Sequence, residues 1–269
     1  MIAVAIDALA IRIEGLRPDE EAEFRWQWGR FRVEPPSDPW ILAKVTHRSG
    51  EPAASFDAKE LRVVREPATS LVTMPGVRAR VPDEGPLAIE VEGDDPGRNA
   101  MAVINVLHAT IAWRIVERGG LLLHAASAVL DGRGFVLVGA EGAGKSTWAR
   151  GMAAAGALAL GDDIALVLPS ASGFDLVGSP LRAKELDGGT PGRWPLAAIL
   201  LPRHAARASL TPATRLEVHA ALAANLPFAT DRGIEPFLAV TEALARTPAR
   251  RLAFTRTDAG ASLLSTMTA

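Results

Sequence analysis

The chain has 269 residues and a formal net charge of −2 at pH 7, from 29 Lys and Arg against 31 Asp and Glu. Hydrophobic residues make up 48% and charged residues 22%, which is typical of a globular protein large enough to bury a core of its own. The near-neutral charge argues against a nucleic-acid partner, and the absence of Cys and Tyr excludes thiolate, disulfide, Cys-metal and phenol chemistry.

The first residues are apolar, but they lack the basic region of a secretory signal and carry Asp7 and Arg12 early. No stretch approaches the ~18 uninterrupted apolar residues of a membrane span. We therefore expect a cytoplasmic protein with no membrane partner. The sequence leaves a homo-oligomer open.

Strand patterns dominate the first 95 residues. Residues 2–14 alternate loosely, and Phe24, Trp26 and Trp28 fall on one face of a predicted strand. Gly29 shifts the register, which predicts a bulge or tight hairpin before a further alternating stretch over residues 30–33. Trp26, Trp28 and Trp40 have two interpretations, a stacking platform for a peptide or a base and ordinary core, and the alternation favours core.

Val77, Ala79 and Val81 predict another short strand, and prolines punctuate the segments between the strands. We therefore predict a β-rich N-terminal domain over residues 1–95. The acidic stretch 92–100 marks the boundary, and an α/β domain is expected over 96–269.

This second domain opens with a predicted helix, because Ile104, Leu107, Ile111 and Ile115 recur at helical spacing before Gly119-Gly120. Two strands joined by a tight turn follow, and then helices alternate with strands. The expected elements are the hairpin strands 121–130 and 135–139, the helix 145–156, the strands 157–160, 164–168 and 194–202, the helices 216–226 and 234–247, and a last strand 250–256.

Residues 139–147 match the phosphate-binding pattern G-x-x-x-x-G-K-[ST] between a predicted strand and a predicted helix. Glycines allow successive backbone N–H groups to face phosphate oxygens, and the helix N-terminus favours an anion. The lysine reaches the β- and γ-phosphates, and the hydroxyl occupies a Mg²⁺ position. The motif thus predicts a site for ATP and Mg²⁺ built from Gly139, Ala140, Glu141, Gly142, Ala143, Gly144, Lys145, Ser146 and Thr147.

Asp162 and Asp163 follow a predicted strand about fifteen residues later, where strand ends meet beside the phosphate site of a doubly wound sheet. One carboxylate can hold Mg²⁺ while the other accepts the proton of an attacking hydroxyl. No ABC-type signature and no N-K-x-D base reader of a GTPase occurs.

The strings LLLHAASAVL, FVLVGAEGAGKST and ALGDDIALV together resemble the catalytic domain of the HPr kinase/phosphorylase superfamily, over residues 118–185. The resemblance implies a P-loop kinase-like domain that binds ATP and Mg²⁺. It implies Asp162 as general base on a serine hydroxyl and His124 near the transferred phosphate. It also implies Lys145 and Ser146 in their P-loop roles and Asp163 near the metal.

Residues 180–189, PLRAKELDGG, differ from the segment that bifunctional members use in phosphorolysis, although Glu185 or Arg182 could stand in. Phosphorylase activity is therefore not expected. Glu141 stands where the family usually has serine. The chain resembles stand-alone members from bacterial gene clusters, some of which phosphorylate precursor peptides.

We therefore expect a bacterial serine kinase acting on a protein or precursor peptide. Two alternatives stay open: a small-molecule kinase, and a non-catalytic, nucleotide-dependent peptide-binding module.

Overall fold

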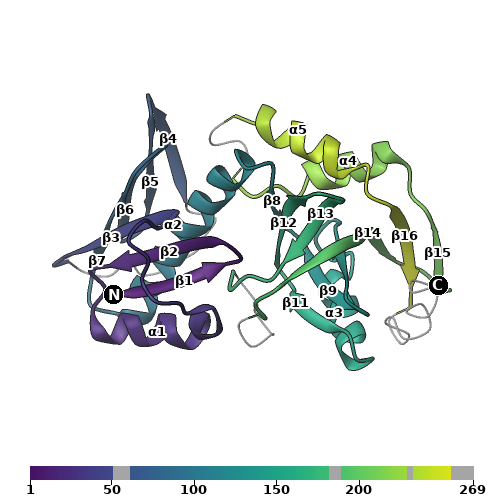
Figure 1. The fold of residues 1–269 in the computed structure, drawn as a ribbon, viewed down its shortest axis with the longest axis horizontal. Helices are drawn as coiled ribbons and strands as arrows, with labels where there is room; N and C mark the ends of the chain where they lie inside the picture. The colour runs from purple at the N-terminus through teal and green to yellow at the C-terminus, as the bar shows by residue number, and fades with distance from the viewer. Residues whose placement is uncertain (51–60, 182–188, 229–232, 256–269) are drawn as a thin grey trace. The chain divides into compact units, whose positions relative to one another are not determined.

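The computed structural model describes residues 1–50, 61–181, 189–228 and 233–255. It is a mixed α/β structure with more strands than helices, and its strands form two sheets (Figure 1). Contacts divide the chain into two compact units, one over Met1–Arg114 and the other over most of the chain from Ile115 onward. Each unit has its own sheet.

The first unit holds a seven-stranded sheet in the order β1-β2-β3-β7-β6-β5-β4. The strand β3 runs parallel to both β2 and β7, and the remaining pairs are antiparallel. Alternating buried residues along β2, β6 and β7 show that one face of this sheet is covered. The strands are β1 (Ile2–Ile6), β2 (Leu9–Glu14), β3 (Ile41–Arg48), β4 (Arg62–Glu66), β5 (Thr69–Met74), β6 (Val77–Pro82) and β7 (Leu87–Glu92).

The strand predicted around Phe24 is wrong, because the helix α1 spans Pro18–Trp28. Pro18 opens this helix, acidic residues fill its first turn, and the Glu20 carboxylate accepts a hydrogen bond from the Arg17 N–H. Phe24 and Trp28, four residues apart, are buried, whereas Trp26 is 81% exposed. The period is therefore 3.6 residues, and the alternation of aromatic residues is incidental.

The segment after α1 also differs from the prediction. Gly29–Phe31 forms a single 3-10 turn, and Arg32 makes one isolated bridge to Val4. Gly29 has φ −59°, so it continues the helical direction instead of making a bulge. The core interpretation holds for Trp28, but Trp40 is only half-buried and the three tryptophans do not share one environment.

The helix α2 spans Pro96–Val116 and confirms the predicted helix. By length and composition it could cross a membrane, but 94% of its most apolar stretch is buried inside the protein, as in a core helix. The Asn99 amide donates to Glu20, and the Arg114 guanidinium donates to Trp40 and Gly85 carbonyls. These contacts tie both ends of α2 to the first unit, which therefore ends at Arg114 instead of residue 95.

The second unit is built on a nine-stranded sheet with the path β11-β9-β10-β14-β13-β12-β8, to which β16 and β15 add beside β14. Its strands are β8 (Leu121–His124), β9 (Ala126–Leu130), β10 (Arg133–Leu137), β11 (Leu158–Gly161), β12 (Ile164–Ser170), β13 (Gly173–Val177), β14 (Arg193–His204), β15 (Ser209–Pro212) and β16 (Ala249–Phe254). Its helices are α3 (Lys145–Ala154), α4 (Arg215–Ala223) and α5 (Glu235–Leu244). The predicted elements of this unit are confirmed, except that the first hairpin strand divides into β8 and β9. The strands β13 and β15 were not predicted.

The strand β14 organises this sheet because it is twelve residues long and has different partners along its length. Its first residues pair with β13, and its later residues run parallel to β10 and β16. The helix α3 packs beside β9 and β11, and its buried face includes Trp148 and Met152. The parallel strands β10, β14 and β16 therefore end at the same edge of the sheet.

Candidate functional site

Three segments that the sequence singled out meet at one edge of the second sheet. Leu137, the last residue of β10, lies opposite Ala126 at the start of β9, and Gly161, the last residue of β11, lies opposite Ser127. The loop that follows β10, the Asp pair that follows β11 and His124 before β9 therefore share this edge. Ligands of open α/β sheets bind at the carboxyl ends of the strands.

The glycine-rich loop, residues 139–144, connects β10 directly to α3. Gly142 and Gly144 have φ of +75° and +92°, a region that other residues avoid. A Cβ on Gly144 would also lie 2.3 Å from the Phe254 ring, so no side chain fits there. The loop thus leads its backbone into the N-terminus of α3, an arrangement that favours an anion.

Lys145 is the first residue of α3, and only 7% of it is exposed. Its ammonium group donates to the carbonyl oxygens of Gly139 at 2.7 Å and Ala140 at 3.2 Å, so it bends back across the loop. Burial lowers the pKa of Lys145, although the nearby carboxylates of Asp163 and Glu141 act in the opposite direction. A polyphosphate at this loop would stabilise the charged ammonium.

Ser146 joins the loop to the carboxylate pair. Its hydroxyl donates to the backbone oxygen of Asp162 at 3.3 Å. Asp162 and Asp163 are 7% and 9% exposed, so both acidic residues are mostly removed from water. Thr147, the last residue of the motif, is half-buried in the first turn of α3.

His124 lies beside the same carboxylates. Its Nδ1 is 3.3 Å from Oδ1 of Asp163, and the next residue, Ala125, donates its N–H to the Asp163 carbonyl. The His124 side chain is 47% exposed, whereas that of Asp163 is 12% exposed. The buried carboxylate can therefore orient an imidazole whose other edge is accessible.

Two residues at this edge were missed by sequence reasoning. Asn225 lies just after α4, and its backbone carbonyl oxygen accepts a hydrogen bond from the backbone N–H of His124. This bond fixes the end of β8. His204 ends β14, and its ring lies 4.7 Å from that of Phe254. Both come from elements that are distant in sequence, and their only sequence signal is a position at the end of a predicted element.

A metal would need more ligands than the side chains alone supply. Within the described ranges, no three His, Cys, Asp or Glu side chains gather as a metal-binding group. Ser146 and Asp163 nevertheless both lie at the loop, and Mg²⁺ is commonly held by one or two carboxylates together with substrate phosphates. Arg182 and Glu185 lie outside the described residues.

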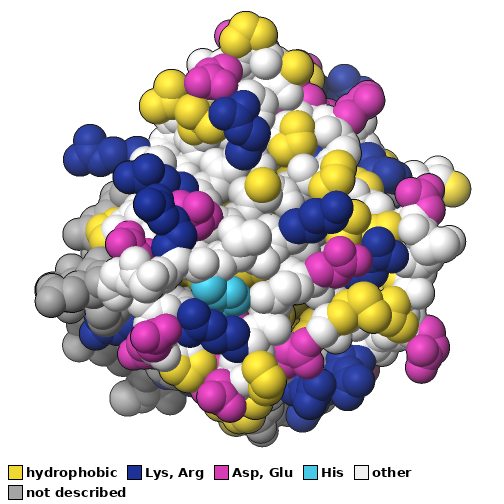
Figure 2. Space-filling view, turned by 90° about the vertical axis from the view of Figure 1, so that its left-hand side faces the viewer, with side chains coloured by type: hydrophobic (Ala, Val, Ile, Leu, Met, Phe, Trp, Pro, Cys, Tyr) yellow, Lys and Arg dark blue, Asp and Glu magenta, His cyan; other side chains and the backbone are white. Residues whose placement is uncertain are grey.

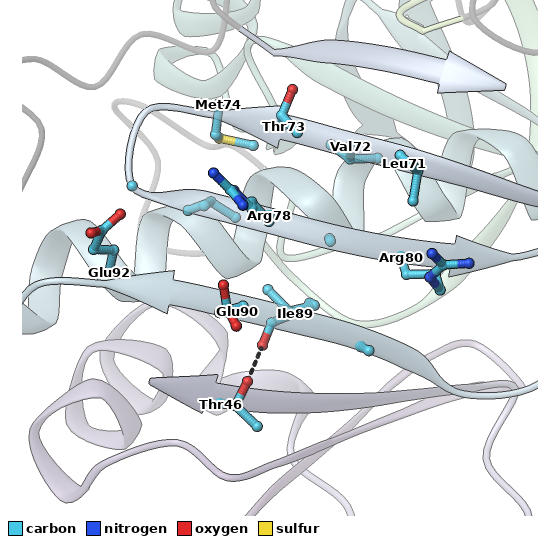
Figure 3. Close-up of a pocket in the computed structure, with 14 residues that line it drawn as sticks. Thr46, Leu71, Val72, Thr73, Met74, Arg78, Arg80, Ile89, Glu90 and Glu92 are labelled. Atoms are coloured by element: carbon cyan, nitrogen blue, oxygen red, sulfur yellow. Dashed lines mark hydrogen bonds between the residues drawn. The ribbon is translucent and has the colours of Figure 1, made fainter. Parts of the chain in front are cut away.

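A separate hollow of about 740 Å³ lies on the first unit's sheet, lined by residues of β3, β5, β6 and β7 (Figure 3). Arg78 and Glu90 lie opposite each other on its floor, and Glu90 forms an ion pair with Arg48 at 3.2 Å.

Figure 2 looks at the side that lies on the left of Figure 1, where Lys and Arg side chains are interspersed with Asp and Glu. The side chains visible on this face therefore form no patch of one sign.

Residues 89–198 are similar to the family described as SynChlorMet cassette protein ScmC. The match covers less than half of the chain, but it includes the glycine-rich loop, the Asp pair and His124. The description of that family names a cassette and no reaction. No curated protein gives a significant match.

Proposed function

We propose that the chain is a cytoplasmic, ATP-dependent kinase that transfers the γ-phosphoryl group to a hydroxyl, with serine of a protein or precursor peptide as the acceptor. The observation that carries the proposal is the shared edge of the second sheet. There the glycine-rich loop, the buried Lys145, the Asp pair and His124 lie together. Phosphoryl transfer needs such positioning and charge stabilisation more than covalent chemistry.

Nucleotide binding is assigned to the loop and to Lys145. The backbone N–H groups of the loop and the N-terminus of α3 would hold phosphate oxygens. The Lys145 ammonium would exchange its bonds to Gly139 and Ala140 for bonds to the β- and γ-phosphates. Glu141 is exposed and can turn away from the anion.

Asp162 orients the acceptor hydroxyl and takes up its proton, and His124 steadies the charge on the transferred group. Bound ATP supplies the phosphoryl group, while Mg²⁺ neutralises charge on the phosphates. Ser146 and Asp163 would hold that metal, and the Ser146 hydroxyl lies within hydrogen-bond distance of the backbone oxygen of Asp162, the residue before Asp163. These assignments agree with the resemblance to HPr-kinase-like P-loop kinases.

A second candidate function is a nucleotide-dependent module that binds a peptide without modifying it. The hollow on the first unit favours it, because Arg and Glu side chains beside apolar floor residues can contact an extended peptide. In this case ATP would bind and no acceptor would become labelled.

The test is γ-phosphate transfer from labelled ATP to candidate peptides, beginning with products of small open reading frames beside the gene. Asp162→Asn should lower transfer about 10²- to 10⁴-fold while ATP affinity stays within twofold, because the group moves a proton and does not hold the nucleotide. Lys145→Ala should lose ATP affinity itself.

Asp131→Asn is the matched control, since Asp131 lies in the β9–β10 turn at the opposite end of β10 and Asn also accepts its positive φ. This variant should match the unchanged protein in both assays. If Asp162→Asn transfers at the normal rate, the proposed role of Asp162 is wrong. If ATP binds and no acceptor is labelled, the binding module replaces the kinase.

A further inference from the structure

If the proposed function is right, the order of strands determines in which direction the bound nucleotide extends from the glycine-rich loop. This inference rests on that proposed function. The Asp pair and His124 lie on the β9–β11 side of the glycine-rich loop, which follows β10. The terminal phosphate must face these groups. The other end of the nucleotide therefore extends toward the opposite flank of β10, where β14 and β16 end.

That flank presents an aromatic pair. His204 and Phe254 are register partners at the ends of the parallel strands β14 and β16. Their ring centroids are 4.7 Å apart, and the Ala205 N–H donates to the Phe254 carbonyl at 2.9 Å. Phe254 is completely buried in the core, whereas His204 is exposed. The buried ring thus supports one side of an imidazole whose remaining surface is accessible.

Both rings touch the phosphate loop. A Cβ placed on Gly144 would meet Phe254 Cζ at 2.3 Å and His204 Nε2 at 3.1 Å. The imidazole is therefore fixed against the last glycine of the loop, immediately before Lys145. A nucleotide whose phosphates occupy the loop would carry its sugar and base past this point.

We propose that His204 is the base-stacking residue of the nucleotide site, held in place by Phe254. The ligand class is a nucleoside triphosphate, and the recognised part is the flat face of its base. Stacking on a ring is tolerant of base identity, because every base has a π-face. ATP and GTP should therefore depend on His204 to a similar degree.

The experiment compares a ligand that has a base with one that has none. Calorimetry measures binding of ATP and of inorganic tripolyphosphate, both with Mg²⁺, to the full chain and to His204→Ala and His204→Phe. His204→Ala should weaken ATP binding by at least about fivefold, the lower end of the range for loss of one stacking contact. Tripolyphosphate affinity should stay within twofold, and His204→Phe should restore ATP affinity because the ring is restored.

His219→Ala is the matched control, since it removes a histidine of α4 that the proposal does not use and should leave both affinities unchanged. Thermal unfolding confirms that each variant is folded. Unchanged ATP affinity in His204→Ala would overturn the inference, and so would an equal loss of ATP and tripolyphosphate, which would assign His204 to the phosphates. If the unsubstituted chain binds neither ligand, the proposed function itself fails.

Discussion

The Nδ1 atom of His124 lies 3.3 Å from a carboxylate oxygen of Asp163, although His124 ends β8 and Asp163 lies in the bend between β11 and β12. The pair is held from both sides by backbone hydrogen bonds, from His124 N–H to Asn225 and from Ala125 N–H to Asp163. A buried carboxylate that orients an accessible imidazole is a common arrangement in catalysis. We therefore expect these two side chains to act as a unit.

The first prediction is that His124→Ala and Asp163→Ala are not additive in phosphoryl transfer. At saturating Mg²⁺ each single variant should lower kcat about 10²-fold, and the double variant should fall little further, because each one alone abolishes the oriented imidazole. Asp163→Ala alone should also raise the Mg²⁺ concentration needed for half-maximal activity. Fully multiplicative losses in the double variant would show that the pair does not act as a unit.

The second prediction concerns two glycines of the loop. Gly142 and Gly144 both have positive φ, but only Gly144 faces a neighbour, Phe254, within contact distance. Gly142→Ala should cost about 1–2 kcal/mol of the free energy of unfolding, from backbone strain alone. Gly144→Ala should cost more and should also abolish nucleotide binding, because the Phe254 ring must move.

Chemical denaturation of the two variants gives the comparison. Phe254→Leu removes the atom that the new Cβ would meet, so Gly144→Ala should cost less in the Phe254→Leu background than in the unsubstituted chain. If Gly142→Ala and Gly144→Ala lower the free energy of unfolding equally, the expected clash between the new Cβ at position 144 and Phe254 does not occur.

The chain from residue 96 onward could largely be predicted, because each predicted element has its own period and clear boundaries. The region around Phe24 could not, since Phe24, Trp26 and Trp28 satisfy a period of two while only the first and last are buried. The signals that decide it are Pro18 and the acidic first turn, which stabilise a helix N-terminus.

At the candidate site, the motif and the Asp pair could be found from the sequence because their residues are close along the chain. His204 and Asn225 could not. His204 reaches the loop only because β14 pairs in parallel with β10 and β16, and Asn225 reaches β8 only through the placement of α4. Long-range pairing of this kind leaves no local pattern.

The third prediction concerns Glu20, whose carboxylate is completely buried in the first unit. It accepts hydrogen bonds from Asn99 at 2.8 Å and from the Arg17 N–H at 2.8 Å, and it lies 2.9 Å from His47 Nε2. Glu20→Ala should cost about 3 kcal/mol of the free energy of unfolding, because three buried or half-buried polar partners lose their acceptor.

Asp19→Ala, which changes an exposed residue in the same helical turn, is the control and should change stability by less than about 0.5 kcal/mol. Urea denaturation measures both variants. A small loss of stability in Glu20→Ala, similar to that in Asp19→Ala, would mean that water replaces the carboxylate. The hydrogen bonds of Glu20 would then contribute little to folding.

The fourth prediction is a pH dependence of stability that depends on Glu217. Arg251 donates to both of its carboxylate oxygens, at 2.8 Å and 2.5 Å, and the Thr214 N–H and hydroxyl add two more hydrogen bonds. These donors lower the pKa of Glu217 from 4.5 to about 2 in the folded chain. The folded state therefore binds fewer protons than the unfolded state between pH 4.5 and pH 2.

The contribution of Glu217 is consequently complete above pH 4.5 and is lost as the pH falls toward 2. Glu217→Gln should destabilise the chain at pH 7, and the difference from the unsubstituted protein should shrink at pH 3. Arg251→Gln should give the same pH profile, since it removes the principal donors. Denaturation midpoints over this pH range provide the measurement, and a difference that stays constant from pH 7 to pH 3 would show that the ion pair does not govern this part of the acid stability.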